Sequence, residues 1–186
     1  ILLLPMIGFG QSWEKHYNLS IYDSGESIQQ TSDGGYILTG HISVLEQDIV
    51  LIKLNSLGDT LWTNRLIEVH DQWGNSVKQS NDNGYIVCGV KEDLQGNGDI
   101  WIIKTDSAGN PQWSLTFGDT LSYDIGSDIQ QTNDGGYIVT GELNDSLCLI
   151  KINSFGIIQW IETYDYGRGK SVEQTSDGGY IICGDN

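Results

Sequence analysis

The chain has 186 residues, of which 38% are hydrophobic, and it contains 24 glycines, 23 isoleucines and one alanine, Ala108. Branched and aromatic side chains favour pleated strands and alanine is the best helix former, so this composition excludes a helical protein and indicates a folded all-β chain. The formal net charge of -16 excludes nucleic acid as a partner, and it also excludes insertion into or binding to an anionic membrane, because both surfaces would repel the chain.

Residues 1–10 form an apolar run that is too short to span a bilayer, which needs about 20 residues. Gly8 and Gly10 stand three and one residues before Gln11, in the small-x-small pattern of a signal-peptide cleavage site. We therefore expect residues 1–10 to be a signal peptide remnant and the mature chain to be exported. A buried first strand is the alternative interpretation. No charged region or initiating methionine precedes the run, so we expect the parent chain to extend further in this direction.

Three sequence markers recur in the same order along the rest of the chain. The tyrosine of a Thr-x-Asp-Gly-Gly-Tyr-Ile type of segment returns after 49, 52 and 43 residues. Counted from one tryptophan to the next, the repeats span about 13–61, 62–112, 113–159 and 160–186. The marker residues are Tyr36, Tyr85, Tyr137 and Tyr180; Trp13, Trp62, Trp113 and Trp160; and Gly25, Gly74, Gly126 and Gly169, which open a Gly-x-x-[Ile/Val]-x-Gln motif.

The first full repeat predicts four short strands. Residues 27–31 form the first, which ends at the Asp-Gly-Gly turn of residues 33–35, a signal for an antiparallel hairpin. Residues 36–40 form the second strand. The third, at 49–52, is a continuous apolar run and should be covered on both faces. The fourth holds Trp62 and Leu66, which share one face because side chains alternate along a strand.

Four antiparallel strands in each unit of about 50 residues is the pattern of a β-propeller blade. We predict an all-β propeller fragment over 11–186, with three full four-stranded blades and a partial fourth, hence an incomplete ring. Closed propellers need roughly 4 to 8 blades. We expect the parent chain to continue; the alternative is an open sheet edge that pairs with another chain or aggregates.

The repeats resemble those of secreted bacterial β-propeller proteins of the Bacteroidetes type. Units of that family read Ser-Ile-Gln-Gln-Thr-x-Asp-Gly-Gly-Tyr-Ile, matched by residues 27–37, and Ile-Lys-Leu-Asp-x-x-Gly-x-x-x-Trp, matched with substitutions by 52–62, 103–113 and 150–160. The resemblance implies a propeller fold, secretion and often a C-terminal sorting domain. The Asp-x-x-Gly-x-x-x-Trp part is also similar to quinoprotein dehydrogenase propellers. The chain lacks that family's adjacent cysteine pair, so this likeness supports the fold and not the activity.

Two recurring polar positions invite a functional interpretation. The aspartates of the Asp-Gly-Gly turns are candidate calcium ligands. Each turn offers only about two oxygen ligands, which favours a structural role for the aspartate in the hairpin turn instead. One lysine recurs in each full repeat, and we interpret it as structural, with its stem on the sheet and its ammonium group near an acid. The residues are Asp33, Asp82, Asp134 and Asp177, and Lys53, Lys104 and Lys151.

Positions where the repeats differ are better candidates for function. Asp93, Asn97 and Asp99 in the longest variable loop are candidate calcium or glycan ligands, although a solvated acidic loop is the simpler interpretation. Trp73 lies outside the tryptophan repeat in an expected connecting loop, where it is a candidate to stack on a sugar. Trp101 replaces Val50 inside a strand and is expected in the core or between blades.

The sequence offers no evident catalytic residue and no cofactor motif beyond the weak calcium candidates. We therefore expect a secreted or cell-surface module with a binding or structural role, whose partner is a glycan or a protein. The alternative is part of a carbohydrate-active enzyme, similar to a glycoside hydrolase, with an acidic site at the propeller axis. A uniquely placed acid or histidine in an otherwise regular loop would discriminate between the two.

Overall fold

The computed structural model describes residues 14–20, 22–43, 46–119 and 122–185, which form fourteen β-strands. Residues 1–10 and Trp13 therefore lie outside the described residues. Within the described part of the chain, no helix has the length and apolar character needed to cross a membrane. The strands are β1 (Tyr22–Gln30), β2 (Tyr36–Ser43), β3 (Gln47–Leu54), β4 (Thr60–Leu66), β5 (Gln72–Gln79), β6 (Tyr85–Glu92), β7 (Gly98–Thr105), β8 (Pro111–Phe117), β9 (Ile125–Gln131), β10 (Tyr137–Leu143), β11 (Ser146–Ile152), β12 (Ile158–Tyr166), β13 (Arg168–Gln174) and β14 (Tyr180–Asp185).

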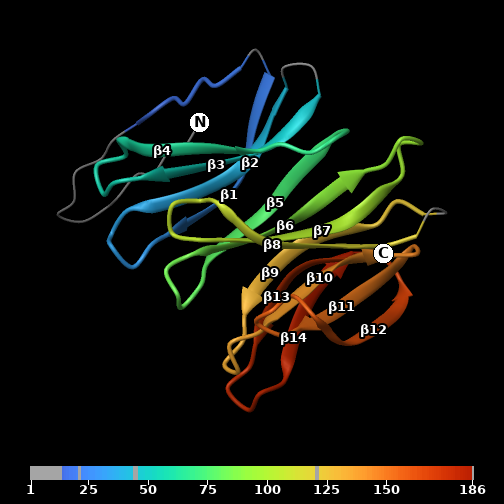
Figure 1. The fold of residues 1–186 in the computed structure, drawn as a ribbon. Coiled ribbons are helices and arrows are strands. Elements are labelled where there is room, and N and C mark those ends of the chain that lie inside the picture. The colour runs from blue at the N-terminus through green and yellow to red at the C-terminus, as the bar shows by residue number, and fades with distance from the viewer. Residues whose placement is uncertain (1–13, 21, 44–45, 120–121, 186) are drawn as a thin grey trace.

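The strands form three four-stranded antiparallel sheets and one two-stranded sheet. The first sheet is β1–β4, the second β5–β8 and the third β9–β12, and β13 pairs with β14. Neighbouring strands are consecutive in the chain, so each sheet is a simple meander (Figure 1). The predicted fold is confirmed: the chain is all-β, with three full propeller blades and a partial fourth, and these sheets do not close a ring. The strands that bear the marker tryptophans Trp62, Trp113 and Trp160 are each the last of their sheet, so a unit counted from one marker tryptophan to the next draws strands from two sheets.

Successive sheets stack through their first strands. We call β1, β5, β9 and β13 the inner strands, because β5 contacts β1, β9 contacts β5 and β13 contacts β9 (Figure 1). Between the first two sheets, Ile37, Ile49 and Leu51 pack against the second sheet, and Trp101 is only 3% exposed within this cluster. The third strands are buried almost throughout, as their continuous apolar runs predict. The expected core position of Trp101 is confirmed.

A repeated tight turn joins the first two strands of every sheet. The residue that follows the turn aspartate has a positive φ: +80° at Gly34, +65° at Asn83 and +82° at Gly135. Glycine and asparagine tolerate this left-handed conformation best, which explains the Asp-Gly-Gly and Asp-Asn-Gly sequences. The turn therefore has the conformation that its sequence predicts.

Candidate functional site

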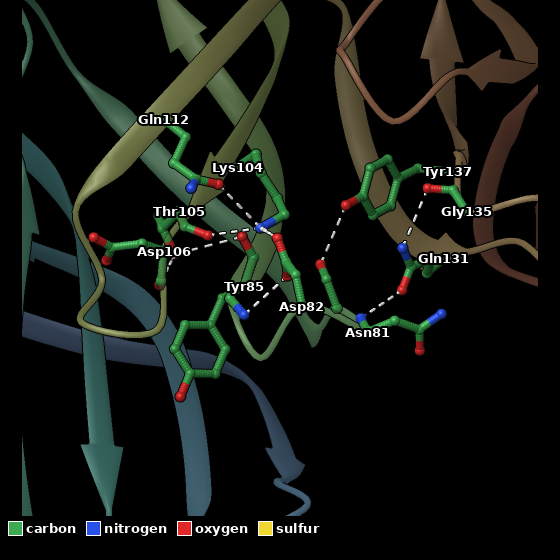
Figure 2. Close-up of polar contacts among 12 residues, drawn as sticks. Asn81, Asp82, Tyr85, Lys104, Thr105, Asp106, Gln112, Gln131, Gly135 and Tyr137 are labelled. Atoms are coloured by element: carbon green, nitrogen blue, oxygen red, sulfur yellow. Dashed lines mark hydrogen bonds and ion pairs between the residues drawn. The ribbon is translucent and has the colours of Figure 1, made fainter.

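The recurring lysines and aspartates form one clamp in each full sheet. Figure 2 shows the clamp of the second sheet, where the ammonium group of Lys104 donates to Asp82 Oδ2 at 2.7 Å and to the carbonyl of Thr105 at 2.8 Å. The Lys104 side chain is buried and the Asp82 side chain is 55% exposed, so the aspartate links a buried charge to solvent. The equivalent ion pairs are Lys53–Asp33 at 2.9 Å and Lys151–Asp134 at 3.0 Å. The predicted contact of each lysine ammonium group with a nearby acid is confirmed.

These turn carboxylates are also bound by their own turns. Hydrogen bonds from the Thr132 hydroxyl, the Gly136 amide and Lys151 lower the pKa of Asp134 to about 2. The corresponding bonds from Thr31, Lys53 and Gly35 lower the pKa of Asp33. Such a carboxylate is ionised at neutral pH and already accepts several hydrogen bonds. The clamp therefore stabilises the hairpin turn, and the aspartate carboxylate oxygens accept hydrogen bonds from within the protein.

Glutamines of the Gly-x-x-[Ile/Val]-x-Gln marker join one sheet to the next. Gln131 Oε1 accepts the backbone N–H of Asn81 in the preceding turn at 2.8 Å, while its Nε2 donates to Gly135 O (Figure 2). Gln79 likewise accepts from the Ser32 amide at 2.8 Å, and Gln174 from Asn133 at 2.9 Å. The same marker therefore serves each of the three junctions between sheets.

A polar groove lies where these junctions meet the inner strands. Its volume is about 450 Å³, and amide side chains dominate its lining. We call it the inner-strand groove, and it is lined by Gln29, Lys78, Gln79, Asn81, Gln130, Gln131, Thr132 and Asn133. The side-chain oxygens of Gln29, Gln79 and Gln131 already accept backbone N–H groups. Amides both donate and accept hydrogen bonds, so the other amides of the lining are chemically suited to a ligand rich in hydroxyl groups.

Asp128 departs from the repeat close to this groove. The corresponding position of the other inner strands carries serine, as in Ser76 and Ser171. Asp128 Oδ1 accepts the Ser76 hydroxyl at 2.8 Å and lies 3.7 Å from the Lys78 ammonium group, and Oδ2 accepts the Ser171 hydroxyl and the Val172 amide, each at 3.1 Å. Both oxygens are thus engaged, and Asp128 ties three inner strands together.

Neither Asp128 nor Lys78 is among the site residues predicted from the sequence. The signal was present, because each departs from the first copy of the Gly-x-x-[Ile/Val]-x-Gln marker, Asp128 at its third position and Lys78 at its fifth. Alignment of the four copies at this marker would have found both residues. It would not have shown that they face each other, since they belong to different sheets.

The predicted position of Trp73 is wrong. Trp73 lies within β5, where it is paired with Val90 of β6, and not in a connecting loop. A β-bulge between Gly74 and Ser76 shifts the register, so that strand pairing continues back to Gln72. The half-buried indole donates its N–H to the side chain of Gln47 on β3. One edge of the ring is thus committed to the adjacent sheet.

The calcium candidates Asp93, Asn97 and Asp99 divide into two arrangements. Asp93 accepts the backbone N–H groups of Gln95 and Asn97 at 2.8 and 3.0 Å and the Asn97 side-chain amide at 3.1 Å. This turn repeats the geometry of Asp106 and Asn110 in the β7–β8 turn. Within the described ranges, no group of three or more His, Cys, Asp or Glu side chains is arranged to hold a metal ion.

Asp99 lies apart on β7, beside Asp124. Burial and the negative charge of Asp124 raise the pKa of Asp99. Among the described residues, Asp99 Oδ1 is buried without a hydrogen-bond partner. Asp124, in contrast, accepts the Ser122 hydroxyl at 2.9 Å and the backbone N–H of Asn144 at 2.8 Å. The structure therefore brings Asp93 and Asn97 together and pairs Asp99 with another carboxylate.

Comparison with known proteins supports the fold alone. No protein-family model and no curated protein matches the chain. It is similar to a crystal structure of a protein of unknown function from Bacteroides caccae, with a TM-score of 0.62 and 14% identity over 89% of this chain and 55% of that one. A weaker likeness, with a TM-score of 0.32 and 9% identity over 83% of this chain and 45% of the other, is to the tail fiber of Staphylococcus aureus phage P68. The chain thus spans about half the length of the Bacteroides structure, with which it shares an arrangement of antiparallel sheets.

Proposed function

We propose that this chain is a secreted or cell-surface propeller module that binds a glycan in the inner-strand groove without chemical turnover. The observation that carries the proposal is the lining of the groove by side-chain amides from three successive sheets. Gln29 comes from the first sheet, Gln79 from the second and Gln130 from the third. A ligand bound there would contact three sheets at once.

The chemistry of the lining favours a neutral glycan over an anion. Sugar hydroxyls donate and accept hydrogen bonds, which matches amides, whereas a phosphate requires only donors and positive charge. Lys78 is the cationic side chain of the groove lining, and its ammonium group lies 3.7 Å from the Asp128 carboxylate. The net charge of -16 further disfavours an anionic ligand.

Asp128 favours binding over the alternative of a carbohydrate-active enzyme. A glycoside hydrolase needs two carboxyl groups that flank the scissile bond, one to protonate the leaving group and one to attack or to activate water. Both oxygens of Asp128 are held by neighbouring inner strands. This arrangement suits a structural carboxylate better than a reacting one.

The extracellular location is part of the same proposal. Its support is the cleavage-site pattern before Gln11 and the resemblance of the repeats to secreted Bacteroidetes-type propellers. The structural likeness to a protein of Bacteroides caccae agrees with that resemblance. Expression of the natural gene in a bacterial host, followed by N-terminal sequencing of any protein recovered outside the cells, tests this part.

Binding to a panel of immobilised polysaccharides tests the proposed ligand class. We expect one or more neutral glycans to bind, and Gln130→Ala and Asn133→Ala to weaken binding at least about tenfold, which corresponds to 1.4 kcal/mol. Gln95→Ala is the matched control, because this amide is exposed in the β6–β7 turn. Unchanged binding in the groove variants would refute the site. Release of reducing sugar that Asp128→Asn abolishes would instead establish the enzyme.

A further inference from the structure

Two charged residues depart from the pattern of the inner strands, and they face each other. In the Gly-x-x-[Ile/Val]-x-Gln marker, Asp128 stands where the other three inner strands carry serine. Lys78 stands two positions later in its own copy of the marker, where the first and third copies carry Gln29 and Gln130. The Lys78 ammonium group lies 3.7 Å from Asp128 Oδ1, across the junction between the second and third sheets. The two departures therefore form one pair of opposite charges.

The junctions between sheets do not require a carboxylate at this position. At the junction between the first and second sheets, Ser27 stands in the place of Asp128, and its hydroxyl accepts the backbone N–H of Val77 at 3.3 Å. Asp128 Oδ2 accepts the equivalent N–H, that of Val172, at 3.1 Å. A serine thus makes the backbone contact that recurs at both junctions. What Asp128 adds is a negative charge beside Lys78, the cationic side chain of the groove lining.

Lys78 differs from the recurring clamp lysines in its hydrogen bonds. The ammonium group of Lys104 donates to Asp82 Oδ2 at 2.7 Å and to Thr105 O at 2.8 Å. Within the described ranges, the Lys78 ammonium group donates no hydrogen bond to the protein, since its 3.7 Å separation from Asp128 exceeds hydrogen-bond distance. The Lys78 side chain is 25% exposed. Its N–H donors are therefore available to a ligand in the inner-strand groove.

Asp128 is placed to compensate the charge of Lys78 without contacting such a ligand. The Asp128 side chain is only 10% exposed, and the groove lining does not include it. Its oxygens accept hydrogen bonds from the hydroxyls of Ser76 and Ser171. Because the pair is partly buried, salt screens it less than a pair on the surface. A ligand in the groove therefore meets the donors of Lys78 without a net positive charge.

We propose that Asp128 determines the specificity of the inner-strand groove, because it compensates Lys78 so that the groove binds neutral glycans and disfavours glycans that carry carboxylate groups. This inference rests on the glycan binding proposed above. A sugar carboxylate beside Lys78 would gain a charge-assisted hydrogen bond, but it would also lie close to the negative charge of Asp128. The repulsive residue thus sets which class of glycan the groove takes.

Substitutions that copy other repeats test this assignment. Asp128→Ser introduces the residue of the other inner strands, and Lys78→Gln introduces the residue found at Gln29 and Gln130. The matched probes are polygalacturonate and its fully methyl-esterified form, which share a backbone and differ in charge. Titration calorimetry at 0.15 M salt measures the binding, because charges more than about 8 Å apart are largely screened under that condition.

We expect Asp128→Ser to bind polygalacturonate at least about tenfold more tightly than the parent does, equivalent to 1.4 kcal/mol. Binding of the methyl-esterified form should not gain in this way, since it has no carboxylate to meet Lys78. The double variant Asp128→Ser/Lys78→Gln should lose the gain. Asp165→Ser is the matched control, because it makes the same change of net charge at an exposed position of β12 and should bind polygalacturonate as the parent does.

Asp128→Asn removes the charge with little change in size, and it should gain affinity for polygalacturonate in the same direction. Thermal unfolding of each variant verifies that it is folded. Folded Asp128→Ser and Asp128→Asn variants that bind polygalacturonate no better than the parent would overturn the inference. So would a gain that persists in the double variant or appears equally in Asp165→Ser. If the parent binds a neutral glycan of the panel in either case, the proposed function stands and only the role of Asp128 falls; a parent that binds none refutes both.

Discussion

The indole ring of Trp62 on β4 meets the phenol ring of Tyr85 on β6 edge to face, with centroids 5.8 Å apart. The pair Trp113–Tyr137 repeats this contact at 6.1 Å, and Trp160–Tyr180 lie 5.8 Å apart. Each tryptophan closes one sheet and each tyrosine belongs to the next sheet. Two of the three recurring markers of the sequence are therefore partners across the junctions.

This contact predicts that Trp113→Ala destabilises the protein by about 3 kcal/mol, since it removes a large ring from a junction and an aromatic pair with it. Gly156 also packs against the Trp113 ring. The midpoint of urea unfolding, followed by circular dichroism, should fall accordingly. Phe155→Ala is the control, because Phe155 is 78% exposed and its loss should change little. Equal effects of the two substitutions would contradict the junction argument.

The strands and the turns could be predicted from the sequence because their determinants are local. The apolar run of β3 and the Asp-Gly-Gly turn before Tyr36 each require only a few neighbouring residues to be recognised. The lysine clamp could also be predicted, since the positions of Lys53 and Asp33 recur together in each full repeat.

The contacts at the junctions between sheets could not be predicted from the sequence in the same way. The bond from the Ser32 amide to Gln79 joins residues 47 apart in the chain, and it depends on how one sheet stacks on the next. Asp128 meets Ser76 and Ser171 for the same reason. Trp73 was misplaced because a bulge extends β5, and bulges are set by strand register and not by composition.

The turn conformation predicts a large effect of Gly135→Val. A branched side chain is strained at a φ of +82°, and the left-handed conformation costs an ordinary residue about 1–2 kcal/mol. No atom lies within 4 Å of an added Cβ at Gly135, so the loss arises from the backbone and not from a clash. Thermal unfolding should show a lower midpoint for this variant. Asn83→Gly, at the same turn position, should leave stability equal or higher; a destabilised Asn83→Gly together with a neutral Gly135→Val would exclude this explanation.

The lysine clamp predicts that Asp82→Ala is more harmful than the loss of an exposed aspartate. Lys104 is buried, so removal of its partner leaves an ammonium group that, among the residues the structure describes, only Thr105 O and Gln112 bind. We expect a loss of about 2 kcal/mol in the free energy of unfolding. Chemical denaturation of Asp82→Ala beside Asp165→Ala, an exposed residue of β12, measures the difference. The double variant Asp82→Ala/Lys104→Met should recover part of the loss, and no recovery would show that the buried charge is not its cause.

The lowered pKa of Asp134 predicts a specific acid sensitivity. Because the carboxyl group has a folded-state pKa of about 2 against an ordinary value of 3.8, its stabilising contribution is present above pH 3.8. That contribution is lost as the pH falls from 3.8 through about 2, where the folded protein takes up the proton. Asp134→Asn should therefore be less stable than the parent at pH 6, and the difference should shrink towards pH 2. Parallel stability curves over this range, measured by urea unfolding, would refute the assignment.

The raised pKa of Asp99 predicts a dependence of stability on pH that is opposite to that of Asp134. Substitution of Asp99 also tests calcium binding. Its pKa is raised by burial and by Asp124, so ionisation of Asp99 destabilises the folded state, and stability is lost as the pH rises through the folded-state pKa. Without calcium, Asp99→Asn should raise the thermal midpoint at pH 7 and should match the parent below pH 3.8, where both side chains are neutral.

If Asp93, Asn97 and Asp99 bound calcium, the ion would stabilise the parent alone, because a ligand that binds only the folded state raises its stability. The Asp93 oxygens already hold Asn97 and the turn, so we expect the same midpoint for the parent in calcium and in chelator. A midpoint that falls in chelator for the parent, but not for Asp99→Asn, would establish the calcium site instead.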